Sequence, residues 1–308
     1  MVTQLCSLML QELSQLVHLH GTFMVIMIVS NFFFALVATI GNLLVITAIW
    51  RASSMLPNIK KLLLNLAMSD LAVGSLAQLM FGIIIAIISR KAVEGASIDF
   101  LCPTILTVCY FVLNLLGVVS FLTVTAMAVD RLIAISLHLR YQELVTPRRV
   151  ELSLVILWLI SGGVAGIFIT TSIRNRLANV IVEIGGLLCT TVAYIRIYSV
   201  SRYHRNQIQS QQRLSRGTGR EVLRRNKLCH NAIFLYVVFM ACYLPFLCSS
   251  VLSLINTPGV FPLLAHNISV FIVLLNSSLN PIVCFSRYGE IRENLKRTMK
   301  RIFLVKTT

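Results

Sequence analysis

A single aspartate within an apolar stretch has the most evident chemistry in this sequence. Asp70 lies in LLLNLAMSDLAVGSL, where an ionised carboxylate is costly unless polar groups surround it. We therefore expect Asp70 to face the interior of a helical bundle. Its candidate partners lie in other apolar stretches, namely Asn42, Ser120, Asn276 and Asn280. A carboxylate with hydroxyl and amide oxygens suits Na⁺ or water. The alternative is a polar cluster that only fixes helix packing.

Three further polar or helix-breaking features lie in or at the ends of apolar stretches. Asp130 and Arg131 end the stretch TAMAVDRLIAI, where opposite charges can interact or simply reach toward water. Pro245 in FMACYLPF and Pro281 in NSSLNPIVCF predict helix kinks, which can serve as hinges in a moving bundle or be plain bends.

Glu183 lies about 8 Å into another stretch, from the rise per residue of a helix. It is placed to meet the cation of a ligand in an open cavity. The alternatives are that the Glu183 side chain points toward the outside, or that it pairs with Arg174 or Arg176.

Reactive side chains are not arranged for catalysis. A membrane hydrolase would need a nucleophile beside a base, or a set of metal ligands. The six His residues lie mostly near the ends or in loops, and none has metal-ligand spacing. We therefore expect no enzyme and no resident cofactor. Cys6 and Cys102 are expected on the oxidising side of the membrane, but the sequence does not tell whether they pair.

Long apolar stretches must position these residues. The composition is 57% hydrophobic and only 12% charged, about half the charged fraction of a soluble protein. Each stretch has roughly the 20 residues that a helix needs to cross a bilayer, and unpaired backbone groups exclude open strands there. The predicted spans are Phe23–Trp50, Leu62–Ser89, Leu101–Leu137, Leu152–Ile173, Ala178–Ser199, Leu228–Ile255 and Phe261–Phe285.

The basic residues indicate the orientation of these spans. All but four of the 27 Lys and Arg lie on one side; the exceptions are Arg90, Lys91, Arg174 and Arg176. The positive-inside rule makes the rich side cytoplasmic, which places the amino end outside and the carboxyl end inside. The net charge of +16 thus indicates topology and attraction to anionic membrane lipid rather than binding of nucleic acid.

We expect an all-α membrane protein, a seven-transmembrane helix bundle with an amphipathic eighth helix on the cytoplasmic surface. Residues 1–22 form a short extracellular tail, 23–285 the transmembrane domain, and 286–308 the cytoplasmic helix and tail. Ile291, Leu295 and Met299 recur at helical spacing in that last segment. The polar stretch Arg202–Arg225 is expected to extend two helices and then break into a link. A transporter would instead show repeated broken helices, and no repeat is evident.

Short motifs in successive spans resemble the rhodopsin-like (class A) G-protein-coupled receptors. The resemblance runs from about residue 23 to 303. It consists of GNLLV (Gly41–Val45), LAMSD (Leu66–Asp70), DRL (Asp130–Leu132), Trp158, Tyr194, FMACYLP (Phe239–Pro245) and NPIVC (Asn280–Cys284), one in each successive helix.

The resemblance implies a role for each group of residues. Asp70, Asn42, Ser120, Asn276 and Asn280 match a site for sodium, an allosteric ion, and water. Arg131, beside Asp130, matches the arginine that meets the G protein after helix six moves outward. The other residues assigned to coupling are Tyr194, Arg224, Arg225 and Lys227. The switch below the ligand corresponds to Phe239, Tyr243 and Pro245, with Asn280 and Pro281 in helix seven.

Several family positions are changed in this chain. Leu132, Tyr243 and Cys284 replace a usual tyrosine, tryptophan and tyrosine, and Gly186 replaces a proline. Arg225 stands where some members carry an acid that clasps the motif arginine, so that lock is expected to be missing. The short link after helix four and the absent proline resemble the melanocortin, cannabinoid and adenosine receptor group, with melanocortin members nearest.

The implied function is a plasma-membrane receptor that binds an extracellular peptide or small molecule and activates a heterotrimeric G protein. The alternatives are a non-signalling or constitutively active relative, or a membrane transporter. Leu113 stands where aminergic receptors carry an aspartate, which argues against a biogenic amine. The expected pocket is lined by Gln78, Leu113, Asn114, Gly117, Glu183, Tyr243, Phe246, Leu247, His266 and Val270.

Overall fold

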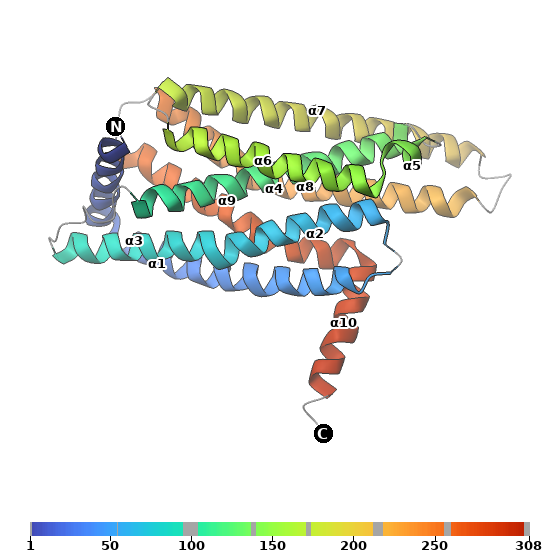
Figure 1. Ribbon diagram of the computed structural model, residues 1–308, viewed down its shortest axis with the longest axis horizontal. Helices are drawn as coiled ribbons and strands as arrows, with labels where there is room; N and C mark the ends of the chain where they lie inside the picture. The colour runs from blue at the N-terminus through green and yellow to red at the C-terminus, as the bar shows by residue number, and fades with distance from the viewer. Residues whose placement is uncertain are drawn as a thin grey trace.

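The protein is a bundle of long helices. The computed structural model describes residues 2–53, 55–94, 104–136, 140–170, 174–211, 218–255 and 260–304, and no strand occurs within these ranges. The long helices lie side by side (Figure 1). They are α1 (Val2–Trp50), α2 (Pro57–Ala72) continued by η1 (Val73–Ala77) and α3 (Gln78–Glu94), α4 (Thr104–Ser136), α6 (Pro147–Thr170), α7 (Arg174–Gln211), α8 (Thr218–Ile255) and α9 (Val260–Arg287). The expected all-α bundle is thereby confirmed.

Most of these helices are long and apolar enough to cross a membrane. Six such segments occur in the described part of the chain: Ser14–Trp50, Pro57–Lys91, Thr104–Ala134, Pro147–Ile167, Ile233–Leu252 and Pro262–Arg287. The remaining long helix, α7, lies parallel to them (Figure 1). Its exposed apolar residues Ile181, Leu188, Val192 and Ile195 recur at helical spacing, which is typical of a face turned toward lipid.

Two short elements stand outside this parallel arrangement. The helix α5 (Tyr141–Leu144) follows α4, and α10 (Gly289–Leu304) leaves the bundle at a steep angle (Figure 1). The amphipathic helix expected after the last span is thus present. Ile291 is fully buried and Leu295 packs against the same core, whereas Arg292, Lys296 and Arg297 are exposed.

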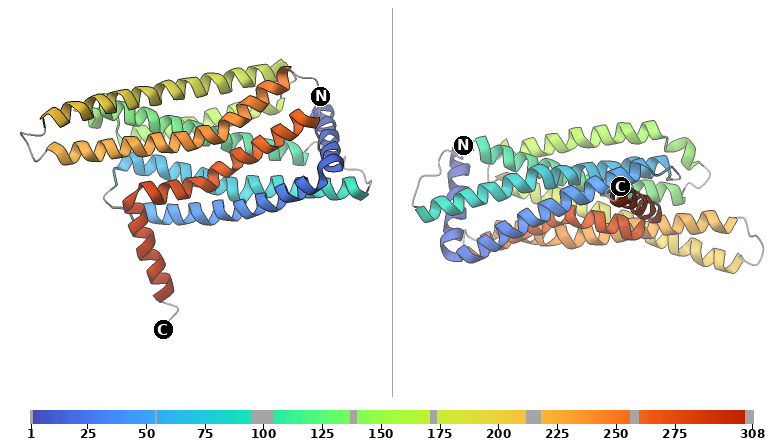
Figure 2. Two further views of the ribbon diagram at one scale, coloured as in Figure 1. Left: turned by 180° about the vertical axis from the view of Figure 1, so that it is seen from behind. Right: turned by 90° about the horizontal axis from the view of Figure 1, so that it is seen from below.

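The amino-terminal tail is more ordered than the sequence indicated. The helix α1 begins at Val2 and has non-helical backbone angles at His20, and the segment before this kink crosses the end of the bundle opposite α10 (Figures 1 and 2). Leu16 and Val17 are buried in one core cluster with Met24 and Ile88. The tail therefore packs on the transmembrane core instead of standing apart from it.

The predicted link between the fifth and sixth spans is mainly helical. As expected, it extends both neighbours: α7 continues to Gln211 and α8 begins at Thr218. Both extensions project beyond the other helices at one end (Figure 2). Residues 212–217 lie outside the described part.

Glycines allow two close helix contacts, the first of which joins the motifs GNLLV and NPIVC. A Cβ atom at Gly41, in GNLLV, would lie 2.8 Å from Cγ of Pro281, so α1 and α9 meet where the α9 proline stands. A Cβ atom at Gly74, inside the π-helical turn η1, would lie 2.8 Å from Cβ of Ala38. The helix α9 and the turn η1 therefore both approach α1 more closely than a larger residue in place of either glycine would permit.

Gly186 makes a third close contact, between α7 and α4. A Cβ atom there would lie 2.8 Å and 2.9 Å from two ring atoms of Phe121. Phe121 in turn packs against Phe239 of α8, with ring centroids 5.7 Å apart. The glycine at the family's proline position thus makes room for an aromatic contact.

We predict that Gly186→Ala lowers the stability of the protein by about 1–3 kcal/mol, the usual cost of overpacking a well-packed core. Thermal unfolding of the purified protein in detergent measures this loss. Adding Phe121→Leu removes the clashing ring and should recover part of it. An alanine variant as stable as the wild type would show that the ring moves away freely.

Candidate functional site

Asp70 lies at the centre of a polar cluster between α2, α4 and α9. Its side chain is fully buried. Ser277 Oγ donates a hydrogen bond to Oδ1 at 2.8 Å, and Asn280 Nδ2 donates to Oδ2 at 2.6 Å. The Ser120 hydroxyl also interacts with the carboxylate and lies 3.4 Å from Ser69 Oγ. The cluster therefore surrounds the carboxylate with hydroxyl and amide groups, as expected for a buried charge.

The two other predicted partners take different positions. Asn42 Nδ2 donates to the backbone oxygens of Ala38 at 2.8 Å and Ser277 at 2.9 Å, so it holds α9 against α1, and these bonds do not include Asp70. The Oδ1 atom of Asn276 is buried and has no hydrogen-bond partner among the residues that the structure describes. An unpartnered buried oxygen of this kind is where a water molecule or a cation gains a ligand.

An aromatic stack lies between α4 and α8. The Phe239 and Tyr243 rings stack with centroids 4.0 Å apart, and Tyr243 Oη donates to the Gly117 backbone oxygen at 3.2 Å. Pro245 lies inside α8 two residues further on. Movement of α8 would have to break the Tyr243 bond, because Gly117 belongs to α4.

At the end of the bundle near α10, Asp130 and Arg131 are both buried and paired with each other. Arg131 Nε donates to Asp130 Oδ2 at 2.9 Å, and Arg131 also forms a second contact with that oxygen through its terminal nitrogen. Tyr141 Oη, from α5, donates to Asp130 Oδ1 at 2.7 Å. Asn58 Nδ2, from α2, bonds to Tyr141 Oη at 3.2 Å and to the Val145 backbone oxygen at 2.8 Å. We call Asp130, Arg131, Tyr141 and Asn58 the arginine clasp.

The clasp pairs Arg131 with the residue that precedes it in α4. The sequence predicted that the acid which some family members carry at position 225 is missing here. Asp130 supplies the carboxylate that pairs with the Arg131 guanidinium. Burial, and then the nearby Asp130 carboxylate, raise the pKa of the Tyr141 phenol to about 12. The phenol therefore stays a protonated donor throughout the physiological pH range.

On the function that the motif resemblance implies, we predict that Tyr141→Phe raises basal signalling severalfold. The variant loses one hydrogen bond to a charged group, which weakens the clasp by about 1.5 kcal/mol. If this bond exists only in the inactive conformation, which we call the closed state, the ratio of active to inactive molecules rises roughly tenfold. Because the pKa of the phenol is raised in the folded protein, its contribution to the stability of the clasp is fully present below its ordinary pKa of 10.0. That contribution is lost as the pH rises toward 12. The variant's effect should therefore be equal at mildly acidic and mildly basic pH, and a clear pH dependence would contradict this account.

Three tyrosines pack together beside the clasp. Tyr194 stacks on Tyr236 with centroids 4.1 Å apart, and its hydroxyl donates to the Val124 backbone oxygen at 3.3 Å. Tyr288, one helical turn beyond Cys284, is buried in the same core cluster. The family phenol missing at position 284 is thus followed by another phenol one turn later.

The half of the bundle away from α10 holds the residues predicted to meet a ligand. Ser249 Oγ lies 2.8 Å from Ser269 Oγ and 3.5 Å from His266 Nδ1, and Phe246 packs beside His266 with ring centroids 5.5 Å apart. Glu183 Oε2 is buried and has no hydrogen-bond partner in the described part of the chain. An unpaired carboxyl oxygen is therefore available among the residues predicted to meet a ligand.

Other predicted pocket residues occupy different environments. Gln78 is completely buried, and its side-chain amide atoms have no hydrogen-bond partner among the described residues. Its backbone oxygen accepts from Asn31 Nδ2 at 2.7 Å, so this residue lies against α1, and its place in the ligand pocket stays a prediction. Asn114 bonds within its own helix, to the Tyr110 oxygen at 2.8 Å. Leu113, Leu247 and Val270 are partly buried.

Some predicted residues fall outside the described part of the chain. The helix α8 contains Arg224, Arg225 and Lys227, but their side chains are among those not described. The same holds for the side chain of Cys6 and for all of Cys102.

Comparison with known proteins decides the family. Residues 41–185 and 175–283 match the family described as 7 transmembrane receptor (rhodopsin family). The chain belongs to this family. It is a G-protein-coupled receptor that binds an extracellular ligand, a multi-pass membrane protein and not an enzyme.

Its relatives include several adenosine receptors. The receptor is 26% identical to rat adenosine receptor A2b over 313 residues, which cover 89% of both chains. It is 27% identical to human adenosine receptor A2a over 309 residues, 86% of this chain and 70% of the relative. Chicken adenosine receptor A2b is 36% identical over 134 residues, 44% and 36% of the two chains. The adenosine group was one of the three indicated by the motifs, and these relatives do not support the preference for melanocortin receptors.

Sequence reasoning missed Ser277 and Tyr141. Ser277 lies three residues before Asn280, so helical spacing could have placed both on one face of α9. Tyr141 lies 11 residues after Asp130 in another element, and no spacing rule connects the two.

Proposed function

We propose that this receptor keeps its amino end outside the cell and its carboxyl end in the cytosol. The support is the distribution of Lys and Arg, which are concentrated at the end that carries the arginine clasp and α10. On this proposal residues 1–22 are extracellular, 23–285 form the receptor domain and 286–308 lie on the cytoplasmic face. Epitope tags at both ends, stained on intact and on permeabilised cells, test the orientation.

The coupling face is proposed to be the clasp end of the bundle. In the closed arrangement Arg131 is buried and paired with Asp130, and Tyr141 holds the Asp130 carboxylate. An outward displacement of α8 would break the Tyr243–Gly117 bond and uncover Arg131 for the G protein. This displacement would open a cleft at the clasp end of the bundle. Tyr194 on α7 would border the cleft, and Arg224, Arg225 and Lys227 of α8 would add positive charge to it.

The ligand is proposed to bind in the opposite half, above the aromatic stack. The residues available there include Glu183, Tyr243, Phe246 and His266. An unpaired buried carboxyl is an acceptor that a ligand bearing N–H, O–H or a cation can satisfy. Because its relatives are named adenosine receptors, adenosine is the first ligand to test.

Sodium is proposed to bind at Asp70 as an allosteric ion. The residues fit a hard cation, because they offer a carboxylate, hydroxyl groups on Ser120 and Ser277, and the unpartnered Asn276 oxygen. A cation that binds only the closed arrangement would oppose activation by mass action. Asn280, which already donates to Asp70, would orient the carboxylate.

The observation that carries the functional proposal is the buried clasp around Arg131 at the basic end of the bundle. Its test is a cyclic-nucleotide and calcium readout in transfected cells, first without ligand and then with adenosine, other nucleosides, peptides and lipids. A ligand response that disappears in an Arg131 variant supports the proposal. A ligand response that is unaffected by that variant would overturn the role of the clasp.

A further inference from the structure

A tyrosine on α8 joins this helix to α7 and has no role in the functions proposed above. Tyr236 is buried, and its Oη lies 2.6 Å from Oγ1 of Thr191 on α7. Thr191 Oγ1 donates to the Leu187 backbone oxygen at 2.6 Å, which uses its single hydrogen. Tyr236 Oη is therefore the donor in the bond between the two hydroxyl groups. We call Tyr236 and Thr191 the hydroxyl latch.

Aromatic stacking fixes the orientation of the Tyr236 ring. Tyr194 of α7 stacks on it, with ring centroids 4.1 Å apart and an angle of 13° between the planes. The Tyr194 hydroxyl donates to the Val124 backbone oxygen on α4 at 3.3 Å, so this second ring is held as well. A ring that is already fixed loses little further freedom when its hydroxyl bonds, so the bond contributes more to joining the two helices.

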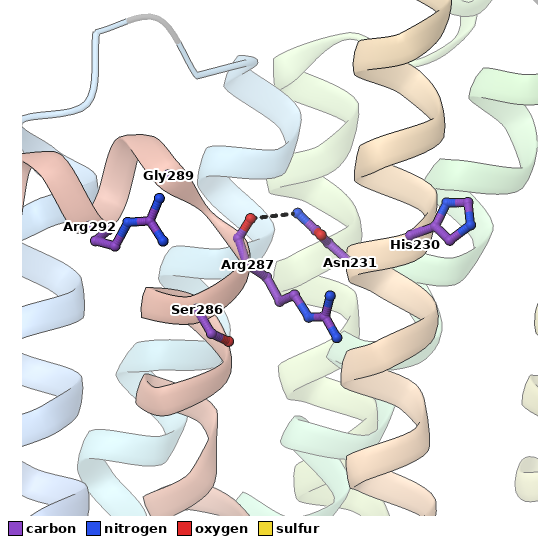
Figure 3. A pocket seen from close by; sticks show the side chains of 6 residues that line it. All are labelled: His230, Asn231, Ser286, Arg287, Gly289 and Arg292. Carbon is purple, nitrogen blue, oxygen red and sulfur yellow. Dashed lines mark hydrogen bonds between the residues drawn. The ribbon is translucent and has the colours of Figure 1, made fainter.

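The helix α8 has another attachment, to α9, nearer the clasp end of the bundle. Asn231 is buried, and its Nδ2 donates to the backbone oxygen of Arg287 at 3.0 Å (Figure 3). The Arg287 guanidinium stacks over the Phe234 ring of α8, 3.9 Å from its centroid. Movement of α8 away from both neighbours breaks the contacts with α7 and α9, whereas a joint movement of α7 and α8 breaks only the contact with α9.

The position of Tyr236 along α8 makes its bond sensitive to bending of the helix. Pro245 lies inside α8, and a proline is a common point of helix bending. Tyr236 lies nine residues from Pro245 toward the clasp end, about 14 Å along the axis, whereas Tyr243 lies two residues from it, about 3 Å. A bend at Pro245 therefore displaces Tyr236 about four to five times as far as Tyr243. The hydroxyl latch reaches its breaking distance before the Tyr243–Gly117 bond does.

We propose that the hydroxyl latch positions α8 in the closed state by bonding it to α7. The residues of the arginine clasp lie on α2, α4 and α5, so of the two clusters only the latch holds α8 itself. The inference rests on one part of the proposed function, namely that α8 moves away from its neighbours during activation. Tyr236 acts through the position of α8, and no contact with ligand or G protein is assigned to it.

The test measures the position of α8 separately from signalling. Spin labels carried by unnatural amino acids replace Val237 of α8 and Val155 of α6, which are both exposed. Electron–electron resonance then gives the distance between the labels in the purified receptor, without ligand or G protein. Basal nucleotide exchange on an added G protein is measured with the same variants lacking the labels. Because the distance does not depend on coupling, failure of the latch and failure of the coupling role are distinguishable.

Small changes at the two latch residues isolate the bond. Tyr236→Phe removes the phenol oxygen and keeps the stacking ring, and Thr191→Val removes the acceptor at similar volume. Thr191→Ser keeps the hydroxyl and should resemble the wild type. The matched control is Thr190→Val, because the Thr190 hydroxyl is next along α7 and pairs with that of Thr125 on α4 at 3.0 Å. Thermal unfolding verifies that each variant is folded.

We expect Tyr236→Phe and Thr191→Val each to raise the ratio of open to closed molecules about fivefold, as for the loss of one neutral hydrogen bond. Basal exchange should rise by a similar factor. The double variant should add little to either single variant, because both remove the same bond. Longer label distances without any exchange would support the latch and count against the coupling role alone.

Two results would overturn the latch. The first is a label distance and basal exchange in Tyr236→Phe that equal those of the wild type, or that change no more than in Thr190→Val. The second is opening in Asn231→Ala but not in Tyr236→Phe, because α7 and α8 would then move together and the bond between them would persist.

Discussion

Replacing Arg131 by alanine abolishes ligand-stimulated G-protein activation while the receptor still folds and reaches the cell surface. The reason is that Arg131 is held in the closed arrangement by Asp130, so its removal deletes the group that the movement of α8 is proposed to uncover. We expect a loss of at least about 100-fold in signalling output, the size expected when a buried, charge-assisted contact of a complex is removed. The measurement is ligand-stimulated nucleotide exchange normalised to surface staining.

Two further variants separate coupling from folding. In Arg131→Ala the buried Asp130 carboxylate loses its positive partner and keeps the hydrogen bond from Tyr141. This buried charge without a counter-ion lowers the stability of the receptor. Arg131→Gln keeps an amide donor beside Asp130 and should fold better while remaining uncoupled. Arg148→Ala removes an exposed positive charge from the same end of the bundle and serves as the matched control. Coupling that persists in Arg131→Gln at normal surface levels would remove the role assigned to this residue.

Replacing Asp70 by alanine eliminates the sodium dependence of ligand affinity. In the wild type we expect sodium to lower affinity for an activating ligand by about fivefold or more, the usual size of an allosteric coupling. The variant lacks the carboxylate at the centre of the cluster, so exchanging sodium for a large organic cation at constant ionic strength should leave its affinity unchanged. Radioligand binding in membranes, with both salts, measures the difference once a ligand is known.

A conservative variant distinguishes loss of the ion from loss of packing. Asp70→Ala leaves Ser277 Oγ and Asn280 Nδ2 buried without their acceptor, so some loss of stability is expected. Asp70→Asn offers both groups an oxygen but no charge, so it should preserve the fold and still abolish the sodium response. A salt response in Asp70→Asn equal to that of the wild type would mean that sodium acts elsewhere.

Both predictions rest on residues that the sequence singled out for a physical reason. A carboxylate such as Asp70 in an apolar helix is expensive in any membrane protein, so its burial among polar groups could be foreseen without coordinates. The length and hydropathy of the apolar stretches likewise predicted the helices, because lipid leaves the backbone few alternatives. The order of short motifs then indicated the receptor family.

The partners within each cluster depend on tertiary structure. Asn276 and Ser277 are adjacent in the sequence, yet Ser277 bonds to Asp70 whereas the Asn276 side-chain oxygen has no hydrogen-bond partner within the described ranges. Adjacent helical residues point about 100° apart, so the rotation of α9 against α2 decides which one meets the carboxylate. That rotation is set by side-chain packing along the whole helix, including the contact of Pro281 with Gly41.

The sequence by itself thus determined that this chain crosses the membrane as helices, buries Asp70 and belongs to a receptor family. Only the tertiary structure decided that Tyr141 from α5 completes the arginine clasp, that Leu16 and Val17 of the tail pack into the core, and that Tyr236 of α8 meets Thr191 of α7. The reason is physical. Solvent and backbone chemistry act on each segment alone, whereas these contacts join separate elements whose relative positions follow from the packing of the entire bundle.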